Sequence, residues 1–345
     1  TDRQIVWIKC AKTMAILAVL LDHTYGYTYT NVNVWSLSYY SVSLFVIIAG
    51  FLSYSSNKKH EYSYVETVLH SCKKIVPAYV LATALYQISD TNFFDFETFV
   101  LHLVHFDATG QFYYVALYMQ LMLVSPLLYK IVICFPKDKS LFYESLLGIL
   151  LICISYVTIR YTNILDIFGG GGILFGGTYL VLFYMGMIIK ANGVLDSGNL
   201  MKYAGFAVCG GILFWNWYKV IFCEIGREKI DSLFPFGYGW SPPSISFSVQ
   251  AICMLVFCFG FFNILNAWRP NGLFIKLVNW NGKHTLYVFL YHRLILCYIL
   301  DKLNLCLNTV TMTMIYILTM ILGSVLIEYF LKVVKSKLKS LWSMR

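Results

Sequence analysis

Long apolar segments recur along the chain and limit its fold more than any other feature of the sequence. Several stretches of roughly 18 or more mostly apolar residues are long enough to cross the hydrocarbon core of a bilayer, which is about 30 Å thick. Of the 345 residues, 59% are hydrophobic and 12% are charged. A soluble domain carries about twice that charged fraction. The sequence therefore predicts an all-α, polytopic membrane protein.

The apolar segments predict about ten transmembrane helices. No polar linker is long enough to separate two domains, so we expect one transmembrane domain over residues 1–345. We expect such a domain to lie in a cell membrane, with the lipid bilayer as its partner. The ten segments are residues 5–23, 39–54, 68–88, 112–133, 141–159, 173–190, 201–218, 246–265, 284–300 and 311–332.

The basic residues indicate how these helices are oriented. With the N-terminus in the cytoplasm and loops assigned alternately, 20 of the 26 lysines and arginines fall on the cytoplasmic side, as the positive-inside rule expects. Segment 89–111, on the other side, has no lysine or arginine but contains four carboxylates. The sequence therefore predicts that both termini are cytoplasmic.

Two classes of ligand are not indicated by the sequence. The net charge of +9 is divided among short loops and forms no single basic patch, so we expect no nucleic-acid partner. The ten cysteines show no CxxC spacing, and no cluster of metal-ligating residues is apparent, so we expect neither a metal site nor a disulfide framework.

Three ionisable residues of the first apolar segment need an explanation, namely Lys12, Asp22 and His23. Lys12 and His23 are 11 residues apart, which at about 100° per residue places them on one face of a helix, with roughly 16 Å of rise between them. Two interpretations fit this spacing. Either Lys12 snorkels to the head groups while the other two residues end the helix, or the three form a working site, as ionisable residues within a span usually do.

Ionisable residues recur in the third and ninth segments. Lys73 and Lys74 stand at the start of the third, where they are either ordinary cytoplasmic anchors or a cationic site for an anionic ligand such as a nucleotide phosphate. His292 and Arg293 lie in the ninth segment near the middle of the bilayer, where a charged group needs partners or water. Snorkelling is difficult from that depth, so the ninth segment gives the better functional signal.

The order of these motifs resembles that of the acyltransferase family 3 membrane proteins. Their first span carries an arginine, ten residues and then a histidine, where this chain has Lys12 and His23. Their second span ends in SGF, where this chain has AGF at 49–51. The likeness covers almost the whole chain and includes the pair Lys73–Lys74 before Pro77, the span YYVALYMQLMLVSPLL at 113–128, and NGKHTLYVFLYHRLI at 281–295.

The resemblance implies transfer of an acyl group, usually acetyl, from cytoplasmic acyl-CoA to a hydroxyl of an envelope polysaccharide or glycolipid, in the inner or plasma membrane of a bacterium. A histidine suits the role of general base, because an imidazole gains and loses a proton near neutral pH. The implied site has His23 as the base and Asp22 as its orienting partner, Lys12, Lys73 and Lys74 on the phosphates of CoA, and His292, Arg293 and Tyr113 around the substrate cavity.

Other functions stay open at this point. Lysine replaces arginine at position 12 and loses the bidentate fork that suits phosphate, which leaves room for a catalytically silent relative. Ionisable residues within spans would also suit a transporter or permease, although the two similar halves expected of many transporters are not found. A membrane scaffold without catalytic activity is the third alternative.

Overall fold

The computed structural model describes residues 2–59, 63–73, 75–136, 139–160, 177–196, 198–234, 243–300 and 310–342. Helices make up nearly all of these residues, and they contain no strand beyond one isolated bridge between Tyr25 and Tyr29. The prediction of an all-α chain is confirmed.

A helix overlaps each of the ten predicted segments. The first half of the chain contains α1 (Asp2–Thr24), α2 (Val32–Ser36), α3 (Ser41–Lys59), α4 (Tyr64–Cys72), α5 (Ile75–Thr91), α6 (Phe96–His105), α7 (Tyr113–Ile133) and α8 (Ser140–Arg160). The second half contains α9 (Gly177–Ala191), α10 (Leu200–Trp217), α11 (Arg227–Asp231), α12 (Ile245–Trp268), α13 (Leu273–Ile295) and α14 (Val310–Trp342).

Six helices in the described part of the chain are long and apolar enough to cross a membrane. The chain is therefore a multi-pass membrane protein, while the total of ten spans and the cytoplasmic side of both termini stay predictions. Helices α1 and α13, which carry His23 and His292, are not among the six. The six cover Val32–Lys59, Gly110–Ile133, Ser140–Thr158, Leu200–Ile225, Ile245–Trp268 and Val310–Val334.

The prediction of one continuous helix over 68–88 is wrong. Helix α4 ends at Cys72 and α5 begins at Ile75. Pro77 lies in the first turn of α5, where its missing N–H is tolerated because that group has no helical partner in any case. The proline therefore favours a new helix start just before it, and the apolar run that continues across the break hides this start from a hydropathy pattern.

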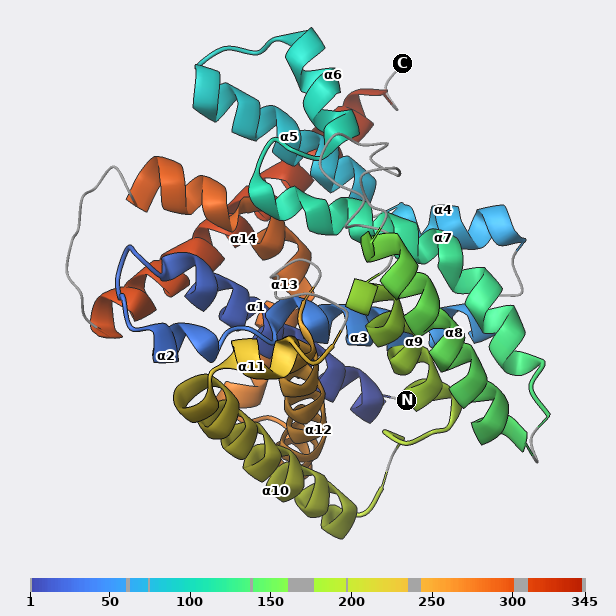
Figure 1. Cartoon of the computed structure of the whole chain (residues 1–345). Coiled ribbons are helices and arrows are strands. Elements are labelled where there is room, and N and C mark those ends of the chain that lie inside the picture. The colour runs from blue at the N-terminus through green and yellow to red at the C-terminus, as the bar shows by residue number, and fades with distance from the viewer. Residues whose placement is uncertain are drawn as a thin grey trace.

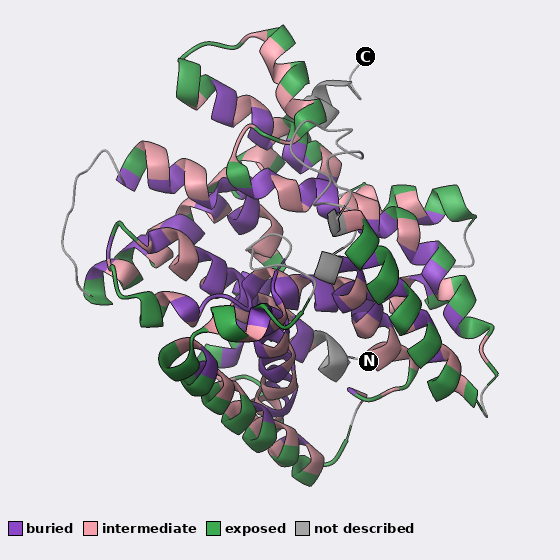
Figure 2. Ribbon diagram, in the orientation of Figure 1, coloured by how far each residue is buried: buried purple, intermediate pink, exposed green. Residues whose placement is uncertain are grey.

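Helix α1 lies in the middle of the bundle (Figure 1), packed against α3, α12, α13 and α14. Most of its side chains are buried, whereas the outward faces of α8 and α10 are exposed (Figure 2). Large apolar side chains such as Leu146, Ile149 and Ile212 occupy those outward faces. Such a distribution suits peripheral helices that contact lipid around a packed centre.

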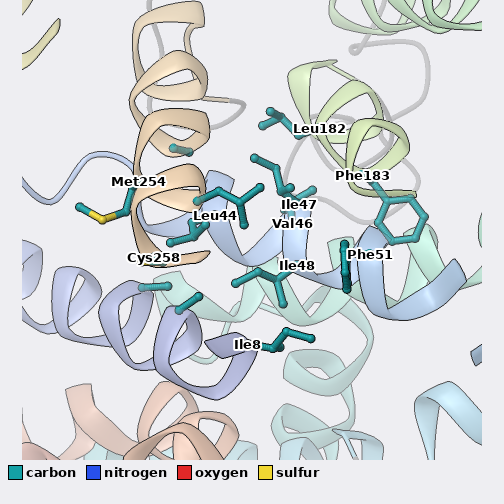
Figure 3. Packing of buried hydrophobic residues seen from close by; sticks show 14 of the residues in the cluster. Ile8, Leu44, Val46, Ile47, Ile48, Phe51, Leu182, Phe183, Met254 and Cys258 are labelled. Carbon is teal, nitrogen blue, oxygen red and sulfur yellow. The ribbon is translucent and has the colours of Figure 1, made fainter. Parts of the chain in front are cut away.

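Small residues bring several helices into close contact. A Cβ on Gly50 of α3 would overlap the carbonyl of Phe183 on α9, and one on Gly186 of α9 would overlap the carbonyl of Ile47. Figure 3 shows Ile47 and Phe183 at this crossing. The small pair at 49–50 thus permits a close helix approach, as small residues commonly do in membrane helices.

Candidate active site

Helices α1 and α13 are held together along their length. A Cβ on Gly282 would overlap the backbone carbonyl of Lys9, so only glycine permits this spacing between the two backbones. Four residues earlier on α13, the carbonyl of Val278 accepts a hydrogen bond from the hydroxyl of Thr13 at 2.6 Å. The two contacts fix the register of α13 on α1, and therefore the relative position of their functional side chains.

This register brings His23 of α1 and His292 of α13 together. Their ring centroids are 5.0 Å apart and the rings are tilted by 32°. The His292 side chain is fully buried, and its Nδ1 lies 3.0 Å from the carbonyl oxygen of Val288 and 2.9 Å from that of Phe289. Because a carbonyl accepts, Nδ1 carries the proton, and Nε2 is left as an acceptor. Within the described residues that buried Nε2 has no hydrogen-bond partner.

The carboxylate of Asp22 is held by the segment that follows α1 rather than by His23. Its Oδ1 accepts a hydrogen bond from the indole N–H of Trp35 at 2.8 Å and one from the hydroxyl of Ser38 at 3.4 Å. The shortest distance from Asp22 to a ring nitrogen of His23 is 4.0 Å, which is too long for a hydrogen bond. Both side chains are about 30% exposed (28% for His23 and 30% for Asp22), so a ligand can reach them.

A cavity of about 370 Å³ extends along the same face of α1. Its walls come from α1, α3, α4, α5, α7 and α13, and Lys12 is the residue of α1 that lines it. Phe289 of α13 also lines it, and its ring centroid is 6.2 Å from that of His292. The cavity therefore joins the neighbourhood of Lys12 to that of the two histidines. Its polar lining residues include Ser53, Ser56, His70, Ser71, Tyr114, Tyr118 and Thr285.

Lys73, one of the two predicted lysines, lies in a groove beside this cavity. Lys73 is exposed and lines an open groove of about 620 Å³ between α4 and α5. His70 lines both the groove and the cavity, so the two hollows adjoin. Lys74 lies outside the residues that the structure describes.

Two other predicted residues, Arg293 and Tyr113, do not line the cavity. Arg293 is partly buried, and one of its guanidinium nitrogens packs against Gly110, at the turn before α7. Tyr113 is the first residue of α7 and packs against the core. Arg293 thus lies beside His292 on α13, whereas Tyr113 lies on a different helix, α7.

Several residues of the site were not identified from the sequence. Trp35 and Ser38 hold Asp22 from a short segment with no motif of its own, and only their closeness in the chain could have indicated them. Glu328 of α14 lies 2.6 Å from His284 of α13 and 2.5 Å from Lys332. That acidic residue interrupts an apolar helix, which was an available signal for a buried ion pair. No group of three or more potential metal ligands occurs among the described residues.

The likeness to a known family agrees with this arrangement. A family model described as an acyltransferase domain matches residues 5–329, which is nearly the whole chain. Neither a curated protein nor a solved structure matches the chain. The family model covers every helix that contributes to the cavity and to the histidine pair, and the chain therefore belongs to acyltransferase family 3.

Proposed function

We propose that the chain transfers an acetyl group from cytoplasmic acetyl-CoA to a hydroxyl of an envelope polysaccharide or glycolipid, in the plasma membrane of a bacterium. Membership of an acyltransferase family supports the reaction class. The observation that carries the proposal is the contact of His23 with His292 next to Phe289, which lines the same cavity as Lys12.

In the proposed reaction His23 acts as the general base. Its imidazole removes the proton of the acceptor hydroxyl while the oxygen forms a bond to the thioester carbonyl carbon. The bond from that carbon to sulfur then breaks, and the proton passes from His23 to the departing thiolate, which leaves as the free thiol of CoA. These steps account for every bond and for the proton, so the proposed reaction needs no cofactor beyond the donor substrate.

His292 supports the base. Its buried Nε2 is an acceptor that lacks a partner among the described residues, and leaving such an atom unpaired costs about 1–3 kcal/mol. An N–H of His23 or the acceptor hydroxyl would remove that cost by donating to it. Either bond holds the reacting groups in one orientation and so favours the transition state.

The positively charged lysine side chains suit an anionic acyl donor that enters from the side of Lys12. Lys73 lines the groove that adjoins the cavity at His70, and Lys12 lines the cavity itself. Lys12, Lys73 and Lys74 would neutralise the phosphate groups of CoA, and the narrow pantetheine arm would extend from Lys12 towards Phe289. Lysine neutralises phosphate as a point charge, whereas arginine would also offer a planar fork.

The test is acetyl transfer by the purified, reconstituted chain. Radiolabelled acetyl-CoA is offered together with envelope fractions of the source cell, and label in glycan is counted. His23→Ala should lower the rate by roughly 10²–10⁴-fold, the usual contribution of a general base. His102→Ala is the matched control, because His102 lies on α6 and pairs with exposed Asp107.

Three results would contradict the proposal. Unchanged labelling in His23→Ala removes that residue from the mechanism. Solute uptake without acetyl transfer would show a transporter. Binding of acetyl-CoA without any turnover would show a catalytically silent member of the family.

A further inference from the structure

A second hollow lies between α1, α10, α12 and α14. It has a volume of about 660 Å³, and its lining includes Leu17, Leu21, Leu37, Phe214 and Leu318. Every lining residue is apolar except Tyr40, whose hydroxyl donates to the backbone carbonyl of Met14 at 3.3 Å. We call this hollow the apolar groove. It shares no lining residue with the cavity that contains Lys12.

The apolar groove and the cavity occupy opposite faces of α1. At about 100° per residue, Leu21 is roughly 180° from Lys12 and roughly 160° from His23 around the helix. Asp22 lies between these two faces. A ligand in the groove and a ligand in the cavity are therefore separated by α1 itself, and they can meet only beyond its C-terminal end, where Asp22 and His23 lie.

In a membrane the open side of the groove would face hydrocarbon rather than water. Two of the helices that form it, α10 and α14, are long and apolar enough to cross a membrane. On α14 the side chains of Met314 and Leu318 are 68% and 56% exposed. Some hydrocarbon chain must fill an apolar groove in that position. Apolar contact alone does not select among lipids, because lipid tails are as apolar as leucine.

The side chains that would select one kind of lipid lie at the end of the apolar groove next to Leu21 and Leu37. Leu21 and Leu37 line it, and the residues that follow them, Asp22 and Ser38, are hydrogen-bonded to each other. Trp35 donates to the same Asp22 oxygen and is stacked on Tyr25 with a centroid distance of 4.2 Å. Aromatic faces beside a carboxylate are the groups that bind sugars, through C–H contacts to the ring and hydrogen bonds to hydroxyls.

We propose that the apolar groove binds the hydrocarbon chain of a lipid-linked saccharide, whose sugar lies on Asp22, Tyr25 and Trp35 at the C-terminal end of α1. This inference rests on the proposed acyl transfer and assigns the acceptor to the glycolipids rather than to free polysaccharides. The donor then occupies one face of α1 and the acceptor the other, and the acceptor hydroxyl comes to His23 around the end of the helix.

Photo-crosslinking in vesicles tests the groove directly. The full chain is reconstituted in phosphatidylcholine that contains a trace of a long-chain alkyl glycoside with a diazirine in its alkyl chain, and crosslinked peptides are mapped by mass spectrometry. A phosphatidylcholine probe with the same diazirine reports ordinary lipid contact. We expect the glycoside probe to label the peptides of Leu17, Leu21 and Met314 several-fold more than the phosphatidylcholine probe does.

Two matched variants on α14 locate the effect. Leu318→Trp fills the groove and should lower labelling by the glycoside probe several-fold. Leu326→Trp should not, because Leu326 is 69% exposed on the same helix but does not line the groove. Tyr25→Ala should lower labelling by the glycoside probe and leave labelling by the phosphatidylcholine probe unchanged.

The outcomes separate this inference from the acyl transfer. Equal labelling by the two probes, or unchanged labelling in Leu318→Trp, would show ordinary membrane lipid in the groove and overturn the inference. Acetyl transfer to a free polysaccharide without groove labelling would do the same while the enzyme activity stands. Groove labelling in a chain that binds no acetyl-CoA would support the groove and refute the proposed reaction.

Discussion

The crossing of α1 and α13 at Gly282 gives the sharpest test of how the site is built. In Gly282→Ala the added Cβ would lie 2.8 Å from the Cβ of Lys9 and closer still to the Lys9 carbonyl oxygen. Ordinary contacts begin at 3.4 Å and the Lys9 carbonyl oxygen would lie only 2.2 Å from the added Cβ, so the helices must move apart by about 1.2 Å (3.4 minus 2.2). The backbone of α1 is the obstacle, and it cannot rotate away as a flexible side chain would.

The magnitude follows from opposing effects. Replacing glycine by alanine within a helix gains about 1 kcal/mol in intrinsic propensity. Overpacking a tight contact costs about 1–3 kcal/mol, and weakening the bond from Thr13 to Val278 costs about 1 kcal/mol more. The free energy of unfolding should therefore fall by about 1–3 kcal/mol in Gly282→Ala. In Gly205→Ala it should rise by up to about 1 kcal/mol, since nothing lies within 4 Å of a Cβ there.

Thermal denaturation in detergent, followed by the loss of monodisperse protein, compares the two variants with the wild type. Acetyl transfer is measured on the same preparations, and kcat should fall in Gly282→Ala because the spacing of His23 and His292 depends on this helix pair. If Gly282→Ala is as stable and as active as Gly205→Ala, the contact with Lys9 does not set the position of α13, and the reasoning from that contact to the histidine pair is refuted.

Three other groups give separate tests. Trp35→Phe keeps the ring beside Tyr25 but removes the donor to Asp22, so the acceptor KM should rise about tenfold, worth about 1.4 kcal/mol, while the KM for acetyl-CoA stays constant. An equal change in both KM values would contradict this. Lys12→Met should weaken acetyl-CoA binding by about tenfold and Lys12→Arg should not, because charge is what phosphate needs; titration in nanodiscs checks it. Hydrogen bonds from Thr98 hold the pKa of Asp95 below its usual 3.8. The cap on α6 is thus intact above about pH 4 and lost as pH falls through the lowered pKa, which hydrogen exchange at Thr98 would show.

The helices could be predicted from the sequence because apolar length alone reports them. The face shared by Lys12 and His23 also followed from helical periodicity, and the cavity lies along that face at Lys12. The contact between His23 and His292 could not be predicted, since it depends on which helices cross and at what register. Gly282 and Thr13 decide that register through backbone contacts, and neither residue carries a signal that a single sequence reveals.

The family resemblance supplied roles but not geometry. It made Asp22 an orienting partner of His23, whereas the shortest distance between Asp22 and the ring is 4.0 Å and the carboxylate is held by Trp35 and Ser38. Adjacent residues on a helix point about 100° apart, so they seldom bond to each other. The partner of His23 comes instead from α13, as the register of two packed helices allows.

The two faces of α1 explain why this helix carries ionisable groups inside a membrane. Lys12 and His23 need a polar route for a charged donor, and the cavity supplies one on their face. Met14, Leu17 and Leu21 need hydrocarbon, and the apolar groove supplies it on the other. A helix divided in this way is neither a uniformly apolar span nor a polar one. Because the two hollows share no lining residue, the proposed thioester and lipid chain would stay apart until both reach Asp22 and His23. A charge placed in the groove by Leu21→Lys should therefore exclude the lipid chain and lower labelling by the glycoside probe, while acetyl-CoA binding on the other face of α1 stays unchanged.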